Sequence, residues 1–151
     1  MGMQNDPGKS ILFSQIGVAV FAVLLLALDL GGYWAVGWLV RLRGIGVSSG
    51  LGMLGTVYVG SVFAWLLLFR MWRLLGNLRR AQVFVPENVE LLRHVSWCCV
   101  AGALVALGGS LFYLPFLFVA LAAGFMALIV RVVKNVFQQA IAMKSELDLT
   151  I

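Results

Sequence analysis

Four long apolar segments constrain this chain more than any other feature of its sequence. A helix needs about 20 mostly apolar residues to cross the hydrocarbon layer of a bilayer, and four such segments account for most of the 151 residues. With 62% hydrophobic and 11% charged residues, the chain is far more apolar than a soluble domain of this length. The sequence therefore predicts an all-α integral membrane protein with one domain, residues 1–151.

The predicted membrane spans cover about residues 11–31, 51–69, 95–112 and 115–133. The connection between the last two spans is short and uncharged, which favours a tight antiparallel hairpin, and Pro115 suits the first turn of the returning helix. A Gly/Ser-rich connection is expected between Arg43 and the second span. The expected architecture is a four-helix bundle of two antiparallel hairpins, with helix extensions on the cytosolic side.

Small residues recur at four-residue spacing within the spans. The clearest stripe, in and just before the second span, consists of Ser48, Gly52, Thr56, Gly60 and Ala64. In lipid, where apolar surface alone does not drive helices together, such a stripe permits close backbone approach. We expect it to be a packing face, either within one chain or between chains.

Asp29 is a carboxylate inside the first apolar segment. It follows Ile11 by eighteen residues, or about 27 Å of helix, which places it near the far interface. Intramembrane carboxylates are candidates for function, but this position favours an interfacial residue that pairs with Arg41 or Arg43. On this interpretation no charged residue lies near the middle of a span, so the usual marks of a transporter are absent.

The distribution of basic residues predicts the orientation of the chain. Nine of the eleven lie on one side of the predicted spans: Lys9, Arg70, Arg73, Arg79, Arg80, Arg93, Arg131, Lys134 and Lys144. The other side has only Arg41 and Arg43. By the positive-inside rule, both termini and the central loop, residues 70–94, should be cytosolic. Anionic lipid explains the net charge of +5, so we expect no direct contact with nucleic acid.

The central loop is predicted to be two helix extensions joined by a bend. Leu74, Leu75 and Leu78 share one face, so the second span should continue beyond the lipid as an amphipathic helix. Pro86 suits the first turn of a new helix. Two carboxylates are expected to pair with nearby arginines, namely Glu87 and Glu90 with Arg79, Arg80 or Arg93.

A second amphipathic helix, residues 134–147, is predicted to leave the membrane after the fourth span. Val136, Phe137, Ala140 and Ile141 recur there at helical spacing. Their face could lie against the central loop or the lipid headgroups, or it could dock a cytosolic protein.

No residue pattern in the chain identifies a reaction. Cys98 and Cys99 are adjacent, which disfavours a mutual disulfide, and His94 is the only histidine. Neither a phosphate-binding glycine loop nor a metal-ligand spacing occurs. We therefore expect no enzymatic activity, no cofactor and no metal site.

Two patches of the sequence resemble a known family. One is VFVPENVELLRHVSWC, with Phe84, Asn88, Leu92 and Arg93, and the other is the closing segment with Glu146, Asp148, Leu149, Thr150 and Ile151. They are similar to the central and closing patterns of domain-of-unknown-function family 2975, small bacterial four-span membrane proteins. The resemblance implies a location in the bacterial cytoplasmic (inner) membrane. Members are often encoded beside a small helix-turn-helix regulator of the Xre/Cro type, which implies that such a cytosolic transcription factor is a partner.

Our leading hypothesis is a non-enzymatic membrane regulator or sensor that docks this transcription factor. The candidate docking residues are Arg79, Arg80, Phe84, Asn88, Leu92, Arg93, Phe137, Asp148, Leu149, Thr150 and Ile151. The alternative is a small transporter or channel subunit, or a self-protection (immunity) protein, acting through the bundle. The lipid bilayer and a second copy of the chain are further expected partners.

Overall fold

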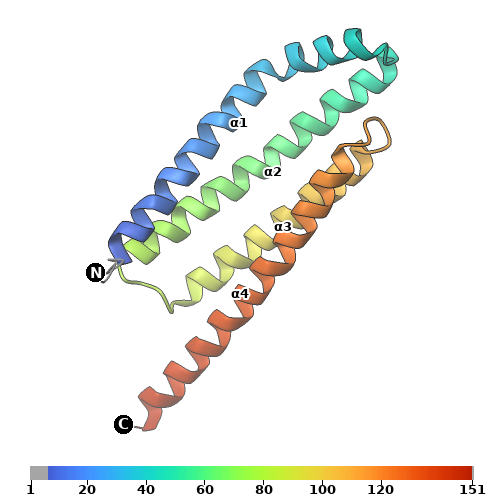
Figure 1. The fold of residues 1–151 in the computed structure, drawn as a ribbon. Coiled ribbons are helices and arrows are strands. Elements are labelled where there is room, and N and C mark those ends of the chain that lie inside the picture. Colours follow the sequence, from blue (N-terminus) through green and yellow to red (C-terminus); the bar gives the residue numbers. More distant parts are fainter. Residues whose placement is uncertain (1–6, 151) are drawn as a thin grey trace, which may run out of the picture.

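The computed structural model describes residues 7–150, and this part of the chain forms four helices with no strand (Figure 1). They are α1 (Pro7–Arg43), α2 (Val47–Arg79), α3 (Pro86–Gly109) and α4 (Phe116–Thr150). Each helix is long and apolar enough to cross a membrane. The predicted all-α architecture with four membrane-spanning helices is thereby confirmed.

The α1–α2 connection is shorter than the sequence suggested. α1 continues through Tyr33 and Trp34 to Arg43, and α2 already begins at Val47. Gly44 makes this sharp reversal possible, because its φ of 62° lies in the left-handed region that glycine adopts without steric cost. The Gly/Ser-rich stretch after residue 46 is therefore the first part of α2 and not a loop.

The predicted helix extensions are continuous with the spans. α4 runs unbroken past residue 133, so the amphipathic segment 134–147 is the last part of the same helix. α2 likewise continues to Arg79, with Leu74 and Leu75 buried as their shared face predicted. At the opposite end of α4, Pro115 immediately precedes the first helical residue.

The helices pack in the order of the chain. α1 contacts α2, α2 contacts α3 and α3 contacts α4, while no other pair of these four helices is in close backbone contact. The two tight turns lie at one end, and the described ends of the chain lie at the other end with the α2–α3 loop (Figure 1). We call the latter the loop end. A groove of about 480 Å³ lies between the helices, lined almost entirely by apolar side chains from all four.

The small-residue stripe of α2 packs within the chain. Gly52 lies against the ring of Phe112, and Thr56 lies against Gly109 at the end of α3. The Thr56 hydroxyl donates a hydrogen bond to the Gly52 carbonyl (2.9 Å), which holds its side chain in place. A Cβ atom at Gly109 would collide with Thr56, so glycine is required for this approach.

The buried core lies mainly between α2, α3 and α4. One cluster at the loop end contains Leu74, Leu91 and Leu92, and partly buried Phe137 packs against it. A second cluster contains Val95, Cys99 and Ala127. Large apolar side chains elsewhere stay exposed, as expected for helices whose outer faces contact lipid.

Candidate functional site

Asp29 lies inside the α1–α2 hairpin, where it joins the two helices. Its carboxylate oxygens accept hydrogen bonds from Ser61 Oγ (2.5 Å) and Trp65 Nε1 (2.7 Å). The Tyr58 hydroxyl donates to the Asp29 backbone carbonyl (3.0 Å). The predicted pairing of Asp29 with Arg41 or Arg43 is therefore wrong.

The helix that carries Asp29 is longer than the predicted first span. α1 does not end near residue 31 but continues to Arg43, which is fourteen residues beyond Asp29, or about 21 Å of helix. Asp29 thus lies inside α1 and not near the end of that helix. A carboxylate inside a membrane helix normally pairs with polar groups of the protein, and here the pairing groups come from α2.

The sequence contained a signal for this cluster. Tyr58, Ser61 and Trp65 are spaced at i, i+3 and i+7, so their side chains fall on one face of α2. Three hydrogen-bond donors on one face of an apolar helix indicate a polar partner on the neighbouring helix. Both Asp29 oxygens accept bonds, so the arrangement acts as a clasp between α1 and α2.

At the loop end, Asn88 holds the bend between α2 and α3. Its side chain is fully buried (0% exposed). Its Nδ2 donates to the backbone carbonyls of Gln82 and Val83, each at 2.7 Å, while its Oδ1 accepts from Asn77 Nδ2 (3.0 Å). Every polar atom of the amide is thus used to fix the loop, and Asn88 offers no surface to a partner.

Two aromatic rings attach the bend to α4. Phe84, in the α2–α3 loop, packs edge-on against Phe137 of α4, with ring centroids 5.9 Å apart. Leu92 is buried beneath this contact in the core cluster with Leu74. The structure therefore brings Phe84 and Phe137 together, and it uses Leu92 for packing.

The charged residues of the loop end form separate, partly exposed pairs. Glu90 binds Arg93 at 3.0 Å, which confirms one predicted pairing. Glu87 binds Arg73 at 3.2 Å, and not the predicted Arg79, Arg80 or Arg93. Because these side chains are about half exposed, each pair contributes at most about 1 kcal/mol.

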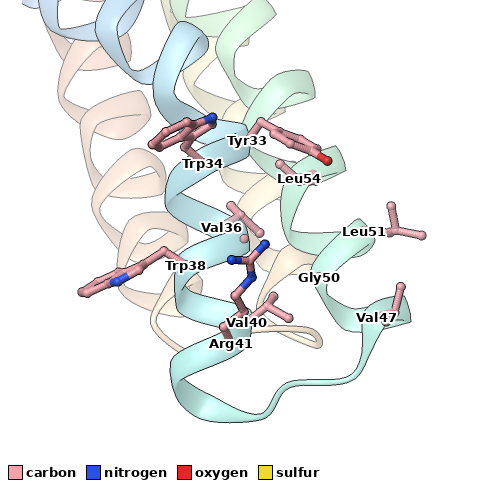
Figure 2. Close-up of a pocket in the computed structure, with 11 residues that line it drawn as sticks. Tyr33, Trp34, Val36, Trp38, Val40, Arg41, Val47, Gly50, Leu51 and Leu54 are labelled. Atoms are coloured by element: carbon pink, nitrogen blue, oxygen red, sulfur yellow. The ribbon is translucent and has the colours of Figure 1, made fainter.

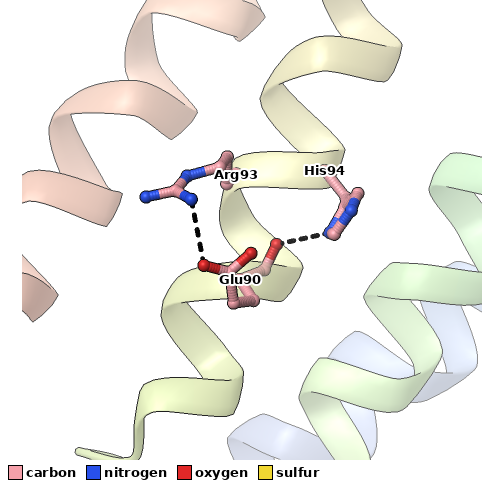
Figure 3. Close-up of polar contacts among 3 residues, drawn as sticks. All are labelled: Glu90, Arg93 and His94. Carbon is pink, nitrogen blue, oxygen red and sulfur yellow. Dashed lines mark hydrogen bonds and ion pairs between the residues drawn. The ribbon is translucent and has the colours of Figure 1, made fainter.

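Three further polar residues of the loop end occupy distinct positions. Arg79 donates to the buried Gln15 side chain of α1 (3.5 Å), whereas Arg80 is exposed at the end of α2. His94 places Nδ1 2.8 Å from the backbone carbonyl of Glu90. Arg93 extends toward α4 and His94 toward α2 (Figure 3). The Arg79 contact joins α2 to α1, and the His94 contact lies within α3.

The closing motif forms the last turn of α4. Asp148 and Leu149 are exposed, with Leu149 83% accessible. Thr150 ends the helix, and Ile151 lies outside the described residues. The C-terminal end of α4 extends away from the α2–α3 loop (Figure 1), so the two predicted patches do not merge into one compact site.

The opposite end of the molecule is rich in exposed aromatic residues. A hollow of about 580 Å³ lies between α1 and α2 beside their turn, lined among others by Trp34, Trp38 and Leu51 (Figure 2). Both tryptophans are largely exposed. Tryptophans in such positions are typical of membrane–water interfaces, and Arg41 extends along the same hollow. This end has the character of a membrane anchor.

No group of three or more His, Cys, Asp or Glu side chains capable of holding a metal ion occurs within residues 7–150. Cys98 and Cys99 are both free thiols.

Each of the four helices is long and apolar enough to span a membrane, and side-chain contacts join the helices to one another. These features define a multi-pass membrane protein. A family model described as "Protein of unknown function (DUF2975)" matches residues 33–151. Because the match covers most of the chain, the protein belongs to this family. No curated protein and no solved structure matches the chain.

Proposed function

We propose that the protein is a non-enzymatic regulator of the bacterial cytoplasmic membrane that docks a cytosolic transcription factor at its loop end. Both termini and the α2–α3 loop face the cytosol in this proposal, in agreement with the distribution of basic residues. The partner is the small helix-turn-helix regulator that the family resemblance implies.

One observation carries the proposal: the last part of α4, which the sequence predicts to leave the membrane, has an exposed apolar stripe. Val136 is 56% exposed and Met143 is 63% exposed. These residues are seven apart and share a face with Leu147, which is 65% exposed. An apolar stripe on a water-facing helix is the feature by which amphipathic helices bind a groove in a partner protein.

The loop contributes to the same surface. Phe84 remains 46% exposed while it packs on Phe137, so the bend and α4 present adjoining surfaces. Arg80, at the end of α2 and four residues before Phe84, is also exposed. Asn88 and Leu92 act indirectly, because burial restricts them to fixing the bend on which Phe84 is carried.

The proposal is tested by co-purification of the full chain, in detergent, with the helix-turn-helix regulator. Met143→Glu places a charge in the apolar stripe, and Ala142→Glu adds the same charge at an exposed neighbouring position on another face. We expect Met143→Glu to weaken capture at least about tenfold, because burying one such side chain contributes about 1.5–3 kcal/mol. Ala142→Glu should capture the regulator like the wild type.

Phe84→Ala tests the loop separately and should weaken capture by a smaller factor. Equal capture by the Met143→Glu and Ala142→Glu variants would reject the stripe as the docking surface. Absence of capture by the wild-type chain would reject the regulator as the partner.

The alternative of a transporter, a channel subunit or an immunity protein has weaker support. Such a protein would be expected to offer a solvated path or a polar binding site between its helices. Both Asp29 oxygens already accept bonds from α2, and the groove between the helices is lined almost entirely by apolar side chains. We therefore propose one function only.

A further inference from the structure

A small pocket between α3 and α4 gathers three basic side chains. Its volume is about 240 Å³, and it is lined by Arg93, Ser96 and Trp97 of α3 and by Arg131 and Lys134 of α4. The Ser96 hydroxyl donates to the Ala127 carbonyl across the interface (3.3 Å). This bond joins the two helices at the base of the pocket, so the basic groups are held on a fixed framework.

The charges in the pocket are not balanced by the protein. Glu90 binds Arg93, but no carboxylate of the described residues forms an ion pair with Arg131 or Lys134. These two cations are three residues apart on α4, a spacing at which like charges repel. A bound anion would relieve this repulsion and accept the hydrogen bonds that both side chains can donate.

The pocket lies at the boundary between apolar and polar parts of the molecule. The apolar run of α4 ends at Val130, directly before Arg131. Trp97, which is 61% exposed, is of the residue type that favours the headgroup layer. Basic pockets between membrane helices at this level suit the phosphate groups of lipid headgroups. An anion bound there would reach the pocket from the membrane surface.

We propose that Arg93, Arg131 and Lys134 form a binding site for a phosphate group, supplied by the headgroup of an anionic phospholipid. Arg131 can bind the phosphate oxygens in a bidentate manner, and Lys134 adds a point charge beside it. Arg93 contributes its remaining guanidinium donors while Glu90 orients it, and Trp97 packs beside the lipid at the rim. The site differs in residues and position from the proposed docking stripe of α4.

The test measures phospholipid retained by the full chain in native mass spectrometry from detergent, comparing phosphatidylglycerol with phosphatidylcholine. The double variant Arg131→Gln/Lys134→Gln removes two cations of the pocket. The control Arg80→Gln/Lys144→Gln removes two exposed cations at the same end of the molecule but outside the pocket. Inorganic phosphate, added as a competitor, forms a second arm.

We expect the wild type and the control variant to retain more phosphatidylglycerol than phosphatidylcholine. In the pocket variant, the ratio of the two retained lipids should fall at least about tenfold. Lys134→Gln alone should produce an intermediate loss, which keeps the result interpretable if the double variant is unstable. An equal loss in the pocket and control variants would overturn the proposal, since it would reflect net charge alone. Displacement of the lipid by inorganic phosphate at equal concentration would overturn the assignment to a lipid headgroup.

Discussion

At the scale of single residues, fully buried Asn88 and partly buried Asp29 are structural connectors. Asn88 satisfies two backbone carbonyls of the α2–α3 loop and one side chain of α2. Asp29 satisfies two side-chain donors of α2 from within α1. A buried polar group without a partner costs more folding free energy than a hydrogen bond contributes. Each connector therefore fixes its neighbours in place.

Asn88→Ala should lower the free energy of unfolding by about 3 kcal/mol, since it leaves the Gln82 and Val83 carbonyls and the Asn77 amide without their partner. Thermal unfolding in detergent, followed by circular dichroism, measures the change. Gln82→Ala is the control, because it removes an exposed side chain and keeps the carbonyl that Asn88 binds. Equal melting temperatures for the two variants would contradict the connector role.

Asp29→Ala should destabilise the α1–α2 hairpin by about 1–2 kcal/mol, because polar contacts between membrane helices typically contribute about 0.6–2 kcal/mol. Asp29→Asn should cost less, since its amide oxygen can still accept one bond from Ser61 or Trp65. The neighbouring Leu30→Ala change, at a side chain 77% exposed, is the control. Thermal unfolding in detergent measures the stability of each variant. A loss of stability in Leu30→Ala as large as that in Asp29→Ala would argue against the clasp.

At the scale of helices, small residues set how closely α2 and α3 approach. Gly52 accommodates the Phe112 ring, and Gly109 accommodates Thr56. Stripes of small residues do this in membrane proteins because dispersion contacts require short distances between backbones. The Thr56 side chain cannot simply rotate away, since its hydroxyl binds the Gly52 carbonyl.

Gly109→Ala should cost about 1–3 kcal/mol, because the added methyl group overpacks the contact with Thr56. Gly108→Ala is a matched control one residue away, where a Cβ atom meets nothing within 4 Å. The double variant Thr56→Ala/Gly109→Ala should regain part of the loss, because it removes the Thr56 methyl and hydroxyl groups but keeps its Cβ atom, and a double-mutant cycle measures this gain. Additive effects of the two substitutions would show that the contact does not limit the approach.

At the scale of the whole molecule, the fold places its two ends in different surroundings. The loop end carries most of the basic residues and the exposed part of α4, while the opposite end carries Trp34 and Trp38. This asymmetry is the physical basis for orienting the protein in a membrane.

Single-cysteine labelling tests the orientation after Cys98 and Cys99 are replaced by serine. We expect cysteines at Gln82 and Lys144 to react with an impermeant thiol reagent only after the cells are opened. A cysteine at Ser48, beside the α1–α2 turn, should react in intact cells. Reaction at Gln82 in intact cells would reverse the assigned orientation.

The number of helices and their hairpin order could be predicted from the sequence, because hydropathy and short connections determine them. The length of α1 could not be predicted, since this helix continues from residue 31 to Arg43 without any backbone signal to stop, whereas α4 includes the helix predicted over residues 134–147. The partner of Asp29 required the register between α1 and α2, which a single sequence does not specify. Asn88 was recognised as important, but its burial depends on how α2 and α3 converge at the bend.

The packing of helices in chain order has a consequence for how the protein assembles. Each helix after the first packs against the helix that precedes it in the chain. Because α1 and α4 form no close contact, no helix pair of the described residues has to wait for a helix far along the chain. Contacts between chain neighbours close short loops, which favours rapid folding. The nascent chain can therefore acquire its native helix pairs stepwise as each hairpin enters the membrane.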